Sequence, residues 1–164
     1  MSKEEITKDF ELRFNKLKQE LKFKANLEEI DKVFYITDGI LKDGFISKNL
    51  SRQICYRIVE LYLSWNEYLH GLIMPNPQNI LNLSESKILT QDEKKKIMEI
   101  IKKIMELNSR NILISLTNNK VEEGKFIDDS FNIWKNEVGP EITIIIKKIN
   151  DEWGRNENTK KKKD

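Results

Sequence analysis

Apolar residues recur at intervals of three and four along most of this 164-residue chain. This spacing places them on one side of an α-helix, because 3.6 residues complete a helical turn. The broadest such pattern covers residues 48–73, where apolar side chains occupy well over half of the helix circumference. A helix that is apolar on most of its surface is typical of the middle of a bundle. The sequence therefore predicts an all-α fold with this segment as its central helix.

Five segments carry an apolar stripe of this kind. We predict a bundle of about five helices, at residues 3–24, 27–36, 48–73, 91–117 and 120–153. Four of them begin with a Ser, Thr or Asn followed three residues later by Glu, the spacing of a capping box. These pairs are Ser2 with Glu5, Asn26 with Glu29, Thr90 with Glu93, and Asn119 with Glu122.

Glycine and proline set the expected boundaries. Asp38-Gly39 and Asp43-Gly44 are turn signals after the second helix, and Pro75 and Pro77 end the third. The apolar stripe of the last helix keeps its phase across Gly139-Pro140, so we expect a kinked C-terminal helix there and not a break. Residues 74–91 then form a long connection, and its five apolar residues favour packing against the bundle: Ile80, Leu81, Leu83, Ile88 and Leu89.

A chain of this length corresponds to about one domain. We therefore assign residues 1–154 to a single helical bundle domain. Residues 155–164 contain no apolar side chain and several lysines, which predicts a disordered Lys-rich tail.

Composition bears on the expected location and on the lysines. The single cysteine cannot form an internal disulfide, no apolar run approaches ~18 residues, and the first residues lack the apolar centre of a signal peptide. These observations predict a cytoplasmic protein that does not enter the membrane. The chain has 23 Ile, 24 Lys and 16 Asn but one Ala, a composition typical of an AT-rich genome. This origin weakens a functional interpretation of the lysines.

The residues that could carry catalysis are few. Glu67 and His70 have the spacing of a di-iron carboxylate motif, but such a site needs two pairs of this kind and His70 is the only histidine. Cys55 lies fifteen residues before His70, about 22 Å along one helix, so the two cannot form a nucleophile–base pair within the chain. The six glycines form no phosphate-binding loop. We therefore expect no enzyme activity, and no catalytic, cofactor-binding or metal-binding residues.

Lysine clusters offer a weak nucleic-acid hypothesis. Arginine, the better bidentate partner of phosphate, occurs only five times, and acidic residues alternate with the lysines of the folded part. The clustered lysines are more typical of a solvated surface. The candidate contacts are Lys94, Lys95, Lys96, Lys160, Lys161, Lys162 and Lys163.

Two further features concern packing. Aromatic residues concentrate between residues 34 and 68, either as core or as the lining of a partner groove or oligomer interface, and Trp65 lies near the centre of the broadest stripe. Asn111 follows the inward face of its helix, so it should either bond another helix or face a polar cavity or a subunit interface. We favour the bond to another helix, in which case replacement by leucine should keep or raise stability.

These observations favour a non-enzymatic interaction or scaffold protein, which binds a protein partner or another copy of itself as a homo-oligomer. The alternative is a nucleic-acid-associated accessory protein that uses the lysine clusters and the C-terminal tail.

Overall fold

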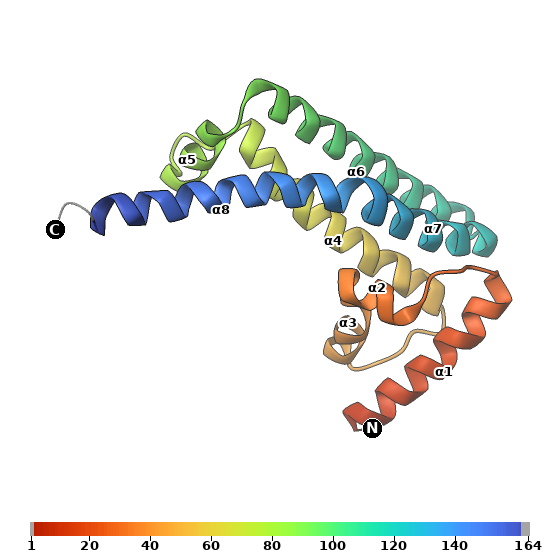
Figure 1. Ribbon diagram of the computed structural model, residues 1–164. Coiled ribbons are helices and arrows are strands. Elements are labelled where there is room, and N and C mark those ends of the chain that lie inside the picture. Colours follow the sequence, from red (N-terminus) through yellow and green to blue (C-terminus); the bar gives the residue numbers. More distant parts are fainter. Residues whose placement is uncertain (1, 162–164) are drawn as a thin grey trace. The chain divides into compact units, whose positions relative to one another are not determined.

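The computed structural model describes the backbone of residues 2–161 and the side chains of residues 2–155 (Figure 1). Every element in this range is helical, as the sequence predicts. The chain divides into two compact units, Met1–Ser64 with Met105–Asn132, and Trp65–Ile104 with Ile133–Asp164. We refer to them as unit 1 and unit 2. The helices α4 (Leu50–Ile73) and α6 (Gln91–Thr117) each contribute to both.

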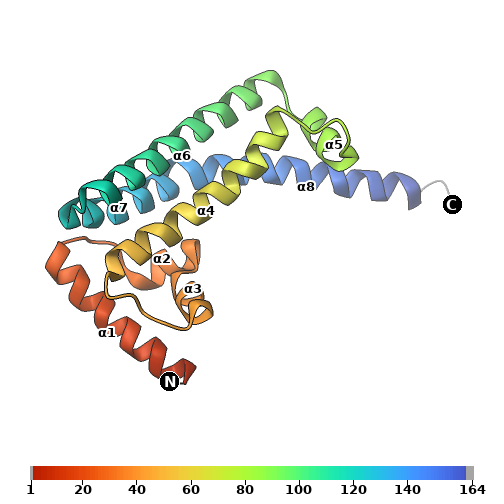
Figure 2. The same ribbon diagram turned by 180° about the vertical axis from the view of Figure 1, so that it is seen from behind.

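Unit 1 contains three complete helices, α1 (Lys3–Leu21), α2 (Leu27–Phe34) and α3 (Ile36–Asp43), together with parts of α4, α6 and α7 (Lys120–Ile133). Both ribbon views place α7 beside the C-terminal part of α6 (Figures 1 and 2). The largest fully buried side chains of this unit are Phe10, Phe14, Ile30, Ile36, Ile40, Ile54, Ile58, Tyr62 and Phe126.

Unit 2 combines the end of α4 and the beginning of α6 with α5 (Ile80–Ile88) and α8 (Gly139–Lys161). The helix α5 lies against α8 in both views, and the indole N–H of Trp153 donates to Glu85 across this contact (3.2 Å; Figures 1 and 2). A π-helical turn, Trp134–Val138, joins α7 to α8 without a break in the helix.

Two of the four predicted capping boxes form completely. At the start of α1, Ser2 and Glu5 each accept the other's backbone N–H (3.2 and 2.7 Å), and Thr90 and Glu93 do the same before α6 (3.2 and 2.7 Å). Asn26 and Asn119 accept backbone N–H groups at the starts of α2 and α7. The predicted starts of these four helices are confirmed.

The turn expected at Asp38-Gly39 is wrong, because both residues lie inside α3. The helix breaks instead at Tyr35, which adopts a left-handed conformation, and Asp31 supplies the carboxylate that accepts the Thr37 N–H (2.7 Å). The second turn signal is confirmed: α3 ends at Gly44, whose φ of 75° favours glycine. The segment predicted as one helix and a turn therefore forms two short helices.

The connection expected over residues 74–91 contains the helix α5. Asn79 caps it by accepting the N–H of Asn82 (3.1 Å), and the hydroxyl of Ser86 donates to the Leu72 carbonyl (2.7 Å). Leu89 is buried as expected, but Ile80 and Leu81 are 77% and 65% exposed. A helix presents only one face to its neighbours, which leaves these two residues outside.

The prediction that Asn111 points inward is confirmed, since it is 3% exposed and its carbonyl accepts from Arg52 of α4. The inward face of α6 continues through Asn111 to Ile114, and the neighbouring apolar residues Ile112, Leu113 and Leu116 are exposed. Trp65 is half-buried, not at the centre of a core.

The continuity of the C-terminal helix across Gly139-Pro140 is confirmed, because the π-helical turn Trp134–Val138 is followed directly by α8. The disordered tail expected over residues 155–164 is not confirmed, because the backbone of α8 is helical through Lys161. Glu152 and Arg155 form an i,i+3 pair (2.9 Å), and lysine and glutamate are good helix formers. Residues 162–164 lie outside the described part of the chain. The described helices outnumber the predicted five, because the second segment is divided in two and the long connection contains a further helix.

Candidate functional site

The junction of α2 and α3 holds Tyr35 in a strained backbone conformation. Its φ of 50° is unfavourable for a bulky residue and costs about 1 kcal/mol. The Tyr35 N–H donates to the Asp31 carbonyl (3.0 Å), and the Gly39 N–H donates to the Tyr35 carbonyl (3.0 Å), so Tyr35 closes one helix and opens the next. Tyr35 is 59% exposed, so burial does little to offset the strain. Strain of this kind is frequently retained for function.

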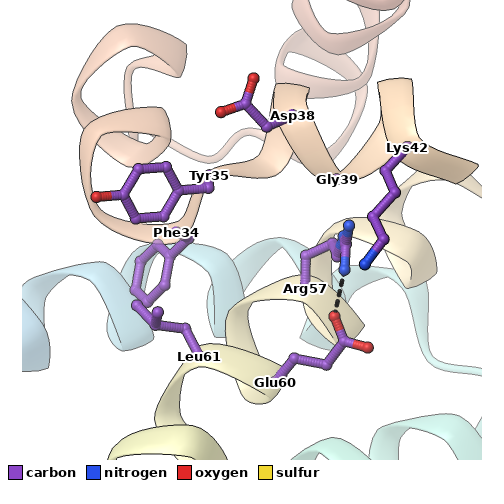
Figure 3. Close-up of a pocket in the computed structure, with 8 residues that line it drawn as sticks. All are labelled: Phe34, Tyr35, Asp38, Gly39, Lys42, Arg57, Glu60 and Leu61. Atoms are coloured by element: carbon purple, nitrogen blue, oxygen red, sulfur yellow. Dashed lines mark hydrogen bonds and ion pairs between the residues drawn. The ribbon is translucent and has the colours of Figure 1, made fainter.

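Gly39 allows Arg57 of α4 to lie directly against α3. A Cβ atom at residue 39 would overlap the Arg57 guanidinium. Arg57 Nη1 donates to Glu60 one turn further along α4 (2.6 Å), while the buried Nε–H has no hydrogen-bond partner among the described side chains. Figure 3 shows this ion pair with the side chain of Lys42 extending toward it. The absence of a side chain at residue 39 thus determines where the guanidinium lies.

A cavity of about 320 Å³ opens beside this ion pair, and we call it the α3–α4 pocket. In Figure 3, Phe34, Tyr35 and Leu61 gather at one end and the charged side chains at the other. The pocket carries no net charge, because its two cations, Lys42 and Arg57, are balanced by two carboxylates, Asp38 and Glu60. The lining residues are Phe34, Tyr35, Asp38, Gly39, Lys42, Arg57, Glu60 and Leu61.

A second cavity, of about 290 Å³, shares Arg57 and Glu60 with the first. We call it the Tyr56 pocket, and its aromatic residues Phe45 and Tyr56 are 61% and 51% exposed. Phe45 lies in the loop between α3 and α4. That loop is fastened by Gln53, whose side chain accepts the Ser47 N–H (2.9 Å) and donates to the Phe45 carbonyl (3.3 Å).

The guanidinium of Arg52 packs against the ring of Tyr56. It lies 4.7 Å from the centre of the ring, a cation–π contact. The same group donates to Asn111 and lies 3.8 Å from the carboxylate of Glu123, which is 2% exposed and accepts from Ser51. We call Arg52, Asn111, Glu123 and Ser51 the buried polar cluster. It joins α4, α6 and α7, so the position of Tyr56 depends on the packing of all three.

Together, Tyr35, Phe45, Tyr56, Arg52 and Arg57 form what we call the aromatic–arginine surface of unit 1. Tyrosine and arginine are enriched among the residues that dominate protein–protein binding energies. The sequence drew attention to the aromatic segment, and Phe34 and Tyr62 are indeed buried. It missed the arginines and Glu123. The one available signal was that two of only five arginines lie near the start of the same helix.

The lysine cluster nominated for nucleic acid lies at the beginning of α6. Lys95 lies 4.0 Å from Asp92, and Lys96 lies 4.0 Å from Glu141. Glu93, in the first turn of α6, pairs with Lys148 (2.8 Å). These carboxylates reduce the local positive potential. The side chains of Lys160, Lys161, Lys162 and Lys163 lie outside the described part.

The residues considered for catalysis lie apart. Glu67 and His70 are exposed on α4, whereas Cys55 is fully buried. Burial raises the pKa of the Cys55 thiol to about 12, so it remains protonated and weakly nucleophilic at neutral pH. Within the described residues, no three His, Cys, Asp or Glu side chains are arranged to hold a metal ion.

None of the helices in the described range is both long and apolar enough to cross a membrane. Comparison with family models, curated proteins and solved structures found no match to this chain.

Proposed function

We propose that this chain is a non-enzymatic interaction protein that binds a protein partner through the aromatic–arginine surface. The observation that carries this proposal is the exposure of three aromatic residues, 51–61% each, beside two arginines that the fold holds in place. Large aromatic side chains at the surface are energetically useful when a partner covers them. The strain at Tyr35 supports the same conclusion, because it persists at a residue whose ring contributes little to the core.

The chemistry of the surface indicates what kind of partner it binds. The two pockets combine apolar lining residues with side chains of both charge signs. The charged residues are Asp38, Lys42, Arg57 and Glu60. Such a surface suits a folded protein with an apolar anchor and a mixed polar rim better than it suits a uniformly charged polymer. A second copy of this chain is one partner of that description.

A photo-crosslinking experiment tests this proposal. Benzoylphenylalanine is introduced at Tyr56 in one variant and at Leu113 in another, and the products formed in the source cells are identified by mass spectrometry. Leu113 is a matched control, since it is an apolar residue of the same unit and 60% exposed. We expect a discrete adduct from residue 56 alone, and its mass distinguishes a partner protein from a homo-oligomer.

A triple variant provides the second arm. Tyr35→Ser, Phe45→Ser and Tyr56→Ser together should abolish the interaction, while Ile112→Ser, Leu113→Ser and Leu116→Ser should leave it intact. Equal crosslinking at both probe positions, or an interaction that the first triple variant retains, would contradict the proposal.

A further inference from the structure

The π-helical turn of unit 2 places a tryptophan over a glycine. The N–H of Gly139 donates to the carbonyl of Trp134, five residues earlier, and Pro140 has no N–H to continue the α-helical ladder. A Cβ atom at residue 139 would lie 2.8 Å from the Trp134 carbonyl oxygen and 3.1 Å from its indole Nε1. Glycine thus allows the indole to lie close against the helix backbone.

A second tryptophan completes an aromatic pair. The ring of Trp65, from α4, lies 6.2 Å from that of Trp134 at an interplanar angle of 42°. Both residues are half-buried and therefore present part of their surface outward. Half-buried tryptophan is common where an apolar ligand or partner is bound.

The aromatic pair lies at one end of a cavity of about 470 Å³, which we call the Trp65–Trp134 groove. The α8 residues that line it are spaced by three and four, so they form one face over about 16 Å of helix. Volumes of this size are typical of sites for small ligands. The lining residues are Trp65, Trp134, Gly139, Ile142, Thr143, Ile146, Lys147 and Asn150.

The groove changes from apolar to cationic along its length. Lys147 is its one charged lining residue and lies about 12 Å from the Gly139 end, counted along the helix. It is exposed, and no acidic side chain among residues 2–155 forms an ion pair with it, whereas the adjacent Lys148 pairs with Glu93 (2.8 Å). An ammonium that forms no ion pair within the described residues, in the part of the groove away from the tryptophans, is complementary to an anionic head group on an apolar chain.

We propose that the Trp65–Trp134 groove binds a single small amphiphile, with its apolar chain along Ile142 and Ile146 against the tryptophan pair and its anionic head group at Lys147. The size of the groove suits one free molecule and not a bilayer surface. This site belongs to unit 2 and is independent of the aromatic–arginine surface of unit 1.

The test uses the full-length chain and its own tryptophan fluorescence. Dodecanoate and dodecyltrimethylammonium carry the same chain with opposite head-group charge, and both are titrated below their micelle concentrations. We expect a saturable emission change with dodecanoate and weaker binding of the cation. Lys147→Met should weaken dodecanoate binding about fivefold, the factor that an ion pair of about 1 kcal/mol represents.

Two variants complete the design. Lys135→Met, an exposed lysine that does not line the groove, should leave the affinity unchanged. Thr143→Phe, at an exposed lining position, should fill the groove and abolish binding without loss of helical circular dichroism. Equal affinity for the two surfactants, no effect of Lys147→Met, or binding to phosphatidylglycerol vesicles without binding of free dodecanoate would each overturn the proposal.

Discussion

Removing the carboxylate of Glu123 should destabilise unit 1 far more than removing that of its neighbour Glu122. Glu123 is 2% exposed, and it is the carboxylate that faces the guanidinium of Arg52, itself 12% exposed (3.8 Å). In Glu123→Ala the arginine remains buried without a counter-ion, and breaking a buried pair in this way costs about 3–5 kcal/mol. Glu122 is 36% exposed and pairs with Lys125 and Arg110 at the surface, where an ion pair contributes about 1 kcal/mol or less.

Urea unfolding followed by circular dichroism measures the difference. With an m value of about 2 kcal/mol per molar urea, Glu123→Ala should lower the midpoint by about 2 M and Glu122→Ala by about 0.5 M or less. The double variant Arg52→Met, Glu123→Leu should recover part of the loss, because it removes both buried charges. If Glu123→Ala and Glu122→Ala unfold at the same urea concentration, the buried polar cluster does not stabilise this fold as we argue.

Four further predictions follow from single contacts. Asn111→Leu should lower the free energy of unfolding by about 1–3 kcal/mol in urea, and not keep or raise it as the sequence suggested, because Arg52 loses its acceptor. Tyr35→Gly should raise that free energy by about 1 kcal/mol, since glycine adopts a positive φ without strain, while it weakens crosslinking at residue 56. Cys55 should react with Ellman's reagent only at the rate of unfolding, because burial keeps the thiol inaccessible and raises its pKa to about 12. The hydrogen bonds that Lys148 donates hold the pKa of Glu93 below its ordinary 4.5, so the melting-temperature difference between wild type and Glu93→Gln should be present at pH 7 and disappear as the pH falls below 4.5.

The sequence predicted the long helices well because their signals are local. Capping boxes such as Ser2 with Glu5 act over three residues, and an apolar stripe such as that of α4 reports directly on one helix face. The short helices were harder to predict, because their boundaries depend on contacts with distant residues. The Asp-Gly pair at residue 38 satisfies a turn rule, yet the glycine is needed there for the approach of Arg57, a residue eighteen positions later. No local pattern contains that contact.

The candidate surface could be predicted only in part, for the same reason. Its aromatic segment is visible as a concentration of rings, but which rings are exposed depends on tertiary packing: Phe34 is buried and the adjacent Tyr35 is not. Glu122 and Glu123 are indistinguishable by type and position, and only the approach of Arg52 from α4 separates a surface carboxylate from a buried one. Long-range pairing therefore decides which polar residues are structural and which remain available for a partner.

The distribution of two residue types makes the two units separately observable. All three tryptophans, Trp65, Trp134 and Trp153, belong to unit 2, whereas the single cysteine, Cys55, is buried in unit 1. Tryptophan emission therefore reports on unit 2, which carries the Trp65–Trp134 groove, and thiol exposure reports on the packing of unit 1, which carries the aromatic–arginine surface. A variant that alters one signal but not the other has perturbed one unit alone. In a two-state unfolding of the whole chain, both signals would change together. Because each proposed site has its own reporter, a loss of binding at one can be separated from unfolding of the unit that carries the other.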